Sequence, residues 1–429
     1  MEKRMKYNNK IIALIYSLLV LLCILLMIKY SGELFQKQSK PMPKKPVEVE
    51  VWTIHGDIEK ALNQSIKKYK DQNPDIEFKV KVFKNEVYQS VIANAMVTDT
   101  LPDIFFIWGY QKLKDYVDAE VVFDLTDYIA KKNMIKDMAP GVMDGFTFHN
   151  KIYAMPLYGW NVSLFCNRQV FQQNGLSYPS TFDELLKVIN ELKNKGVIPL
   201  AAGGKEAWLT SLYYMSFVLE YGTRDEVYEA ATSIDKFNTE PFTNAAKRFE
   251  TLVRARPWQK NFSEDDSYNA AYLFTQGQTA MLLTGSWVSS AIDISDSQVK
   301  GLVDVIPFPG INESQGVGGF VDTYVISKNS VLTQKEEYIN LYLELMQSIS
   351  TISCEELGIG VPVYSSQVIN KDKFPTLFQC ILNNKDKIYH PAYDQIFDAV
   401  LTKRYYDLLS NLMLEEITAD EFIKGLMKE

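Results

Sequence analysis

The chain of 429 residues has little histidine and little cysteine. Its three histidines lie far apart in the sequence, which argues against a histidine-rich metal site or a histidine-relayed triad (His55, His149 and His390). The four cysteines show no CxxC spacing, which excludes zinc ribbons and thioredoxin-type redox motifs. Nucleophile-elbow, phosphate-loop, dinucleotide-binding and HExxH patterns are also absent. The sequence therefore nominates no catalytic, metal or cofactor site by motif.

Positive charge is scarce outside the amino terminus. Residues 1–47 contain nine Lys/Arg and two Asp/Glu, whereas the whole chain has a net charge of −8, so residues 48–429 carry −15. Because a nucleic-acid partner needs a basic face that neutralises phosphates, we exclude nucleic acid as the main partner. The apolar content of 47% and charged content of 23% are typical of a globular protein with two or three domains.

Residues 11–28 form an uncharged apolar run. As a helix this run is about 27 Å long, close to the roughly 30 Å of a hydrocarbon core. Basic residues precede it, as in a signal sequence or the inward end of an anchor (Lys3, Arg4, Lys6 and Lys10). Lysines also follow it, so the charge rule alone does not fix its orientation. We expect a transmembrane helix. A soluble body on the extracytoplasmic side of the cell membrane is expected from its function rather than from this segment.

Cys23 lies inside this run and suggests comparison with a lipoprotein signal. A lipobox has a small residue before the cysteine and ends its apolar run there, but Leu22 precedes Cys23 and residues 24–28 continue the run. An uncleaved anchor is favoured, with cleavage and lipidation left open. Residues 31–46 are polar with three prolines and resemble a semi-extended tether. The other cysteines have apolar neighbours, so we expect small buried side chains and at most one disulfide (Cys166, Cys354 and Cys380).

The body begins with alternating strands and helices. Apolar residues at every second position predict strands at 47–51 and 76–82. The apolar run 104–108 predicts a strand buried on both faces. Helices are predicted at about 85–97 and after Asp57, the latter with one apolar face (Ile58, Leu62, Ile66 and Tyr69). This order predicts a parallel sheet covered by helices.

The same pattern recurs in the rest of the body. Residues 197–202 resemble a strand, and residues 205–275 resemble a mostly helical region. Three Thr-x-x-Glu sequences predict capping boxes at helix starts (Thr181/Glu184, Thr333/Glu336 and Thr418/Glu421). We therefore expect two α/β lobes with a ligand cleft between them, because open α/β sheets bind ligands at the carboxyl ends of their strands.

Four of the six tryptophans stand at a strand end or turn beside a glycine or polar residue (Trp108, Trp160, Trp208 and Trp287). A tryptophan that serves only the core more often lies within an apolar periodic run. An indole at a loop tip can stack on the apolar C–H face of a sugar, while neighbouring polar groups bind the hydroxyls. For each single tryptophan, core packing remains the alternative, but we expect at least two of the four to line one site.

A series of segments along the body resembles, in order, one protein family. They are the strand ending at Trp52 with the turn 73–76, the segments 102–108, 150–157, 163–186 and 274–287, and the group 305–310, 316–320 and 360–364. In this order they resemble the extracellular solute-binding proteins of sugar-importing ABC transporters, the family that includes maltodextrin-binding protein. The resemblance covers about 47–429. The missing lipobox, and Cys166 where an aromatic residue is common, are departures from the family pattern.

The resemblance implies a two-lobed periplasmic-binding-protein-like α/β fold, in which each lobe is a sheet flanked by helices. The chain would cross between the lobes near 157–161, 317–321 and 328–360. The implied organisation is a signal or membrane anchor at 1–30, a linker at 31–46, lobe 1 at 47–158 plus about 320–358, and lobe 2 at 159–319 plus about 359–429.

The resemblance also implies ligand contacts without catalysis. The matching positions are His55, Asp57, Trp108, Trp160, Glu206, Trp208, Trp287, Gly319 and Tyr364. The aromatic residues would stack on sugar rings, and two carboxylates would accept hydroxyl hydrogen bonds (Asp57 and Glu206). A ligand held by both lobes would stabilise the closed form.

The function implied is capture of a mono- or oligosaccharide and its presentation to the permease subunits of an ABC transporter. A receptor subunit that reports ligand occupancy to a membrane signalling complex would share every residue named above. A carbohydrate-active enzyme would need two positioned acids, and the sequence nominates none. A peptide- or iron-binding relative is a further alternative, although iron would favour Tyr, His and Asp ligands over indole surfaces.

Overall fold

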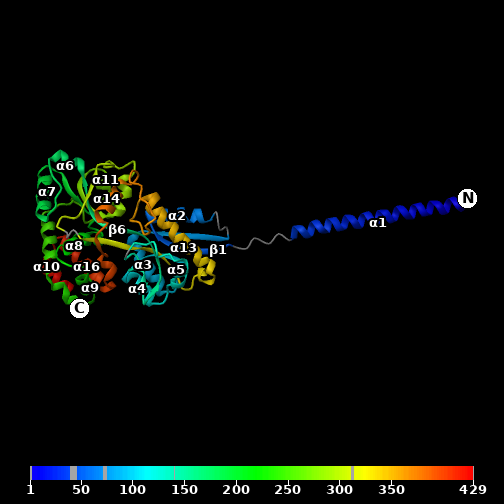
Figure 1. The fold of residues 1–429 in the computed structure, drawn as a ribbon, viewed down its shortest axis with the longest axis horizontal. Helices are drawn as coiled ribbons and strands as arrows, with labels where there is room; N and C mark the ends of the chain where they lie inside the picture. The colour runs from blue at the N-terminus through cyan, green and yellow to red at the C-terminus, as the bar shows by residue number, and fades with distance from the viewer. Residues whose placement is uncertain (1, 39–45, 71–74, 140, 311–313, 429) are drawn as a thin grey trace. The chain divides into compact units, whose positions relative to one another are not determined.

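The computed structural model describes residues 2–38, 46–70, 75–139, 141–310 and 314–428. The chain divides into two compact units, Met1–Val47 with Asn73–Glu77, and Glu48–Gln72 with Phe78–Glu429 (Figure 1). We call the second unit the body. The expected turn at Asn73-Pro74 and residues 39–45 of the expected linker lie outside the described residues.

The first unit consists mainly of one long helix, α1 (Glu2–Gln38). Within α1, residues Ala13–Ser31 are long and apolar enough to cross a membrane, a test that a signal sequence also passes. The Ser17 hydroxyl donates to backbone carbonyls one turn back, which satisfies it inside an apolar stretch. Because α1 continues to Gln38, the first part of the expected tether is helical.

The main sheet of the described chain has nine strands. Seven of them follow one another across the sheet, while β9 (Val303–Ile306) pairs with β6 and β11 (Ile388–His390) pairs with β10. The order of the seven is β2 (Ile76–Phe83), β1 (Val47–Ile54), β3 (Ile104–Trp108), β10 (Gln315–Ile326), β6 (Met155–Asn167), β8 (Thr279–Gly285) and β7 (Ile198–Ala201).

Lobe 1 contains the predicted strand–helix alternation. β1 and β3 pair in parallel, and β3 is almost wholly buried, as its apolar run predicts. The predicted face of the first helix packs inward at Ile58, Leu62 and Tyr69. The helices are α2 (Asp57–Lys70), α3 (Asn85–Val97), α4 (Gln111–Asp118), α5 (Thr126–Lys132) and α13 (Glu336–Thr351), with a hairpin of β4 (Thr147–Phe148) and β5 (Lys151–Ile152) and a π-helical turn (Ile352–Leu357).

Lobe 2 is built on β8 and β7, which are parallel, and on a large helical cluster. At its centre α8 (Ala207–Tyr221) is buried along residues 209–219, so the predicted helical region 205–275 is confirmed. The other helices are α6 (Arg168–Asn174), α7 (Phe182–Asn194), α9 (Arg224–Thr232), α10 (Glu240–Arg254), α11 (Ser267–Thr275), α12 (Ser289–Asp293), α14 (Pro375–Asn384), α15 (Tyr393–Ile396), α16 (Ala399–Met413) and α17 (Ala419–Leu426), with 3₁₀ turns Ile234–Asn238 and Ser286–Val288.

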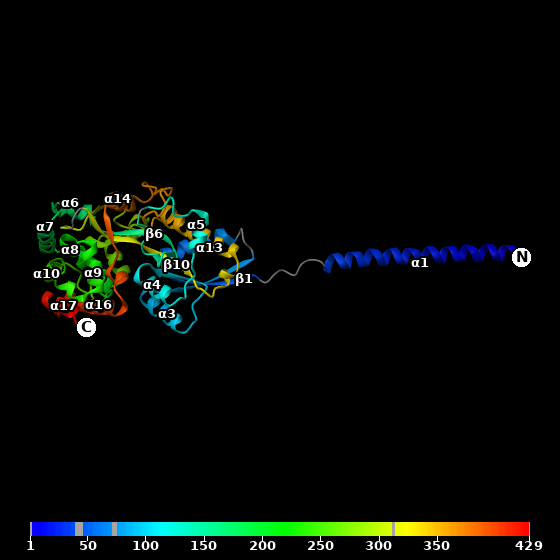
Figure 2. The same ribbon diagram turned by 60° about the horizontal axis from the view of Figure 1, so that its bottom comes forward.

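Two long antiparallel strands, β6 and β10, join the lobes at the centre of the body (Figure 2). All of β6 is buried. Gly318 of β10 pairs with Asn161 of β6, where a Cβ would overlap the carbonyl oxygen of Trp160. The strand register shifts on both sides of Asp322, which marks an irregularity in β10 beside the crossing. The chain thus passes along β6 and β10 near 157–161 and 317–321, the positions at which it was expected to cross between the lobes.

The third crossing lies later than expected. Residues 359–368 were assigned to lobe 2, but the Val363 carbonyl accepts from the Ala139 amide and the Ser365 amide donates to the Asp137 carbonyl, both of lobe 1. The chain reaches lobe 2 at α14, where Thr376 binds the Asp293 carboxylate. Lobe 2 therefore resumes near residue 375.

Capping chemistry is confirmed at two of the three predicted helix starts. The capping boxes of α7 and α17 form at Thr181 and Thr418. The box predicted at Thr333 is wrong, because this residue lies in a 3₁₀ turn (Val331–Gln334) and donates to the Ser330 carbonyl, while α13 starts without a side-chain cap. An unpredicted box caps α9 at Thr223 and Glu226.

Candidate functional site

A cavity of about 650 Å³ lies between the two lobes of the body. Lobe 1 contributes the end of β1, the start of α2 and Trp108 at the end of β3. Lobe 2 contributes the loop between β7 and α8, the start of α11, and the residues that follow β8. The crossing strands supply Tyr158 and Asp322. The cavity thus lies where strands of both lobes end, as expected for an open α/β architecture.

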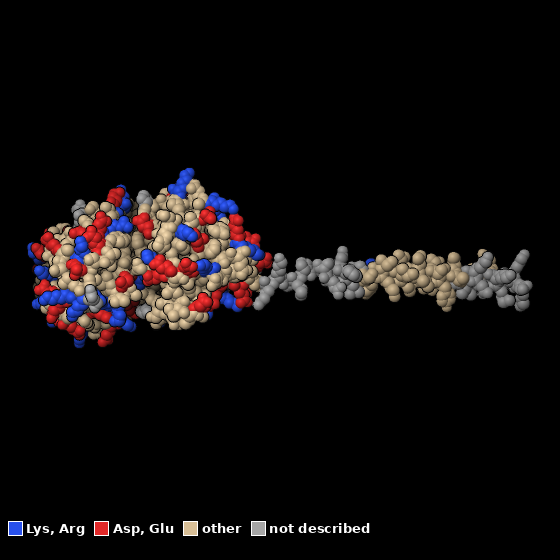
Figure 3. Space-filling model, turned by 90° about the horizontal axis from the view of Figure 1, so that it is seen from below, with Lys and Arg blue, Asp and Glu red and all other residues tan. Residues whose placement is uncertain are grey.

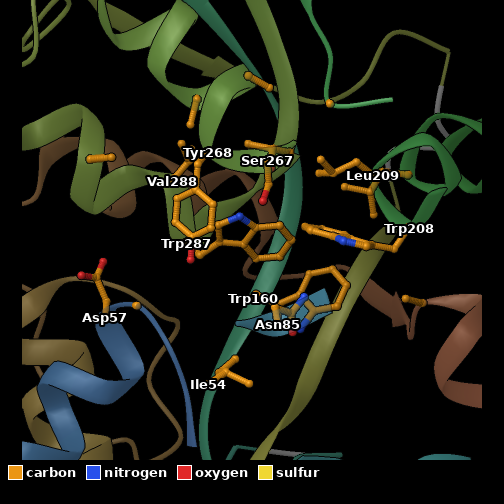
Figure 4. A pocket seen from close by; sticks show the side chains of 18 of the residues that line it. Ile54, Asp57, Asn85, Trp160, Trp208, Leu209, Ser267, Tyr268, Trp287 and Val288 are labelled. Atoms are coloured by element: carbon orange, nitrogen blue, oxygen red, sulfur yellow. The ribbon is translucent and has the colours of Figure 1, made fainter. Parts of the chain in front are cut away.

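Three indoles from lobe 2 and the crossing strand form one wall of the cavity (Figure 4). The Trp287 ring centroid lies 5.3 Å from that of Trp160 and 5.8 Å from that of Trp208. Trp160 comes from β6, Trp208 from the first turn of α8 and Trp287 from the turn after β8. We call these three residues the indole wall. Trp108 lines the cavity from lobe 1.

Gly285 explains the Gly-x-Trp pattern at the end of β8. The Trp287 ring folds back over Gly285, so that a Cβ at residue 285 would overlap the indole. The glycine thus permits the ring position found in the indole wall. This close approach gives the motif a physical meaning that the sequence pattern alone did not show.

The indole wall also carries a directional donor. The Nε1 of Trp208 is buried and has no hydrogen-bond acceptor among the described residues. A buried N–H without an acceptor is costly, so nearly all such groups find one. This donor is therefore suited to an oxygen of a bound molecule.

Asp57 lines the cavity from lobe 1, at the start of α2 (Figure 4). Its Oδ2 accepts a hydrogen bond of 2.8 Å from Ser290 Oγ of α12, and its Oδ1 accepts one of 2.6 Å from Lys60. His55 also lines the cavity and pairs with Glu59 at 2.8 Å. Since Asp57 belongs to lobe 1 and Ser290 to lobe 2, this hydrogen bond joins the lobes across the cleft.

A second interlobe contact involves Lys112 and Asp394. Their charged groups lie 3.4 Å apart, and both side chains are mostly buried. Lys112 also donates to Gln89 and stands over the Trp108 ring. The carboxylate of lobe 2 is thus placed near an aromatic surface of lobe 1.

Asp322 is an acid in the cavity lining that sequence reasoning missed. Burial raises its pKa to about 7, and a hydrogen bond from the Tyr158 hydroxyl opposes the rise. Near neutral pH this carboxyl can therefore change from a donor to an acceptor. Its position inside an otherwise apolar strand, GGFVDTYVI, was the available sign in the sequence.

Six of the nine residues nominated from the sequence line the cavity, namely His55, Asp57, Trp108, Trp160, Trp208 and Trp287. The other three do not. Glu206 is buried and accepts from the Ser267 amide at 2.6 Å, so it fixes the start of α11. The backbone of Tyr364 forms an isolated antiparallel β-bridge with Met138 of lobe 1. Gly319 has open space around its Cβ position and lies outside the lining.

No group of three metal-ligating side chains occurs among the described residues. All four cysteines are free in the described chain, and three of them are buried, as expected (Cys166, Cys354 and Cys380). Burial raises the pKa of these three thiols above the usual range, which keeps them protonated and unreactive.

Residues 55–341 match the family of bacterial extracellular solute-binding proteins. The chain belongs to this family. Its members are extracellular binding proteins, and the two-lobed α/β fold of this solute-binding protein agrees with that membership. The matched region includes the indole wall and Asp57, and it ends within α13.

Two curated relatives and one solved structure illustrate the similarity. The multiple sugar-binding protein of Streptococcus mutans is 21% identical over 308 residues, which are 68% of this chain and 70% of that protein. The diacetylchitobiose binding protein NgcE of Streptomyces coelicolor is 29% identical over 195 residues, 42% of this chain and 39% of that protein. A structure from work on xylan utilization by Caldanaerobius polysaccharolyticus has a TM-score of 0.83 and 26% identity, covering 89% of this chain and 99% of its own.

Proposed function

We propose that this solute-binding protein captures a neutral carbohydrate between its lobes and presents it to the permease of an ABC transporter. The observation that carries this proposal is the indole wall facing carboxylates across one cavity. A sugar ring has apolar C–H faces, which stack on indoles, and hydroxyls, which need directional partners. The Trp208 Nε1 group and the Asp57 carboxylate supply a donor and an acceptor for them.

The charge of the cavity supports a neutral ligand. Its charged lining is acidic on balance, with four acids against one lysine, Lys60 (Asp57, Glu59, Asp322 and Asp394). Ionised carboxylates only accept hydrogen bonds. An anionic ligand would be repelled by them, whereas a hydroxyl can donate. On the face drawn in Figure 3, acidic and basic residues are interspersed over the body, which suits a soluble protein better than a phosphate-binding surface.

The relatives narrow the ligand class that we propose. One is described as binding multiple sugars, one as binding diacetylchitobiose, and one comes from work on xylan use. We therefore propose a short neutral oligosaccharide and name xylo- and chito-oligosaccharides as the first two series to test. We propose binding and lobe closure only, without a catalytic step.

We also propose that α1 stays as an uncleaved membrane anchor. Its apolar segment continues past Cys23 to Ser31, unlike a lipobox. Full-length Cys23→Ala is then expected to remain in the membrane fraction, and the wild type to show no mass gain from acylation. Release of the variant into the soluble fraction, or an acylated wild type, would contradict the anchor. A helical anchor in place of a lipid also suits the alternative role, a receptor subunit of a signalling complex.

A thermal-shift screen of the detergent-solubilised full chain tests the proposed function. A ligand at 100 times its dissociation constant adds about 2.7 kcal/mol to the free energy of unfolding. We expect neutral xylo- or chito-oligosaccharides to raise the melting temperature. Polygalacturonate fragments, which are acidic, should leave it unchanged. A rise with acidic fragments alone would contradict the neutral-ligand proposal, and no rise with any saccharide would contradict sugar binding.

A further inference from the structure

Helix α11 carries two large aromatic side chains on its exposed face. Tyr268 is 57% exposed and Tyr272 is 60% exposed. Because they are four residues apart, they lie on the same side of the helix, one above the other. The core contacts of α11 come from other residues, including Ala270 and Phe274, which are buried. The fold of the helix therefore does not require aromatic residues at 268 and 272.

The first of these tyrosines belongs to the cavity. Ser267 and Tyr268 line it at the start of α11, and Figure 4 shows the Tyr268 ring beside Trp287 and above Asp57. A Cβ on Gly56 of lobe 1 would lie 3.6 Å from the Tyr268 hydroxyl oxygen. Tyr268 thus stands at the edge of the cavity, where lobe 2 comes closest to the loop before α2.

The second tyrosine continues this surface outward. One turn of helix advances about 5.4 Å along the axis, which is comparable to the length of one sugar unit in a linear chain. Tyr272 itself does not line the cavity, although Ala271 beside it does. An aromatic strip of Tyr268 and Tyr272 therefore leads from the indole wall toward solvent.

We propose that Tyr268 and Tyr272 form an outer subsite, which stacks on the sugar unit that projects from the cavity. This inference rests on the proposed function and deepens it, because it assigns the ligand as an oligosaccharide longer than the cavity holds. The occupant is the terminal unit of the same ligand, since the strip is continuous with the cavity. Exposed aromatic faces at the mouth of the cleft suit the C–H face of a pyranose.

Length dependence of affinity tests the outer subsite. Dissociation constants of the full chain in detergent are measured by titration calorimetry with xylo- and chito-oligosaccharides of two to six units. We expect Tyr272→Ala to weaken binding of the longer ligands by about three- to tenfold and to leave the shortest bound ligand unaffected. Tyr272→Phe keeps the ring and should bind like the wild type.

The matched control is Tyr221→Ala. Tyr221 is an exposed tyrosine at the end of α8 and lies outside the cavity lining. Its substitution should leave the ratio of long- to short-ligand affinity unchanged. Melting temperatures of all variants are measured in parallel, and Tyr272→Gln replaces Tyr272→Ala if the latter is poorly folded.

The outcomes separate the two proposals. An equal loss of affinity for short and long ligands, or no loss at all in Tyr272→Ala, overturns the outer subsite while sugar binding stands. An effect of Tyr272→Phe as large as that of Tyr272→Ala overturns stacking and points to the hydroxyl. A wild type that binds no neutral saccharide, in these series or in the thermal-shift screen, overturns the proposed function, and the outer subsite with it.

Discussion

Some residues of the cleft could be nominated from the sequence and others could not. The four tryptophans were found because each stands beside a glycine or polar residue at a strand end. Glu206 does not line the cavity, because its carboxylate accepts from a backbone amide. A carboxylate in that role has the same local sequence as one that faces a ligand. Asp322 and Tyr268 were missed because they reach the cavity only when distant segments meet. Ligand contact itself stays a prediction for all of them.

Trp208 offers a test that separates hydrogen bonding from packing. Trp208→Phe keeps an aromatic ring and removes the buried Nε1 donor. We expect sugar affinity to fall by about 0.5–1.5 kcal/mol, the usual worth of one hydrogen bond, as measured by calorimetry. Trp258→Phe is the matched control, because its Nε1 is also buried but the residue lies outside the cavity lining. Equal losses of affinity in both variants would contradict a ligand contact at Trp208.

Asp322 should make stability depend on pH. Its carboxyl has a pKa of about 7 in the folded protein against 3.8 for the ordinary group, so the folded state holds an extra proton between these values. The free energy of unfolding contributed by this group is therefore highest at low pH and falls as pH rises from about 4 to about 7. Asp322→Asn cannot ionise and should gain stability relative to the wild type over that range. Urea unfolding at pH 5 and pH 8 measures the difference, and parallel pH profiles would contradict it.

At the scale of helices and strands, local patterns predicted most of the architecture. The strands at 76–82 and 104–108, the helices around them and two of the three capping boxes are confirmed. The membership in the solute-binding family and the two-lobed fold are confirmed as well. The third crossing was placed too early, because residues 359–368 attach to lobe 1 through backbone hydrogen bonds that leave no periodic pattern in the sequence.

The crossing strand β10 gives a prediction at this scale. A Cβ on Gly318 would overlap the Trp160 carbonyl oxygen, and its φ of 157° is one that side chains rarely adopt. Gly318→Ala should lower the free energy of unfolding by about 1–3 kcal/mol, as overpacking does, and should displace Trp160 in the indole wall. Urea unfolding and sugar titration measure the two effects.

Gly316→Ala is the control on the same strand. The nearest atom to its Cβ position is the Cδ of Lys387 at 3.4 Å, which belongs to a flexible side chain. Its stability and affinity should stay near those of the wild type. A Gly318→Ala protein as stable as Gly316→Ala would show that the crossing tolerates a side chain. Gly319, which was nominated as a ligand contact, has no atom within 4 Å of its Cβ position.

At the scale of the whole body, the two lobes are joined by a few polar contacts across the cleft. Asp57 binds Ser290, and Lys112 pairs with Asp394. A third contact joins Arg224 of lobe 2 to Asp144 of lobe 1, with nitrogen and oxygen 3.3 Å apart. The hydrogen bond and the Arg224–Asp144 pair each contribute little. For the mostly buried Lys112–Asp394 pair, the cost of removing both charges from water offsets their attraction. Closure without ligand should therefore be only marginally favoured, which leaves a bound sugar able to shift the equilibrium.

Ser290→Ala tests this balance because it removes one interlobe hydrogen bond and leaves Asp57 paired with Lys60. Losing about 0.5–1.5 kcal/mol from the closed form changes the ratio of open to closed molecules by about two- to tenfold. We expect the unliganded variant to have a larger radius of gyration in solution scattering than the wild type. With saturating sugar the two proteins should become alike, since the ligand then holds both lobes. Ser295→Ala, an exposed serine outside the cavity lining, should behave as the wild type throughout. Identical scattering of Ser290→Ala and wild type without ligand, together with no contraction of either on binding sugar, would mean that capture proceeds without lobe closure.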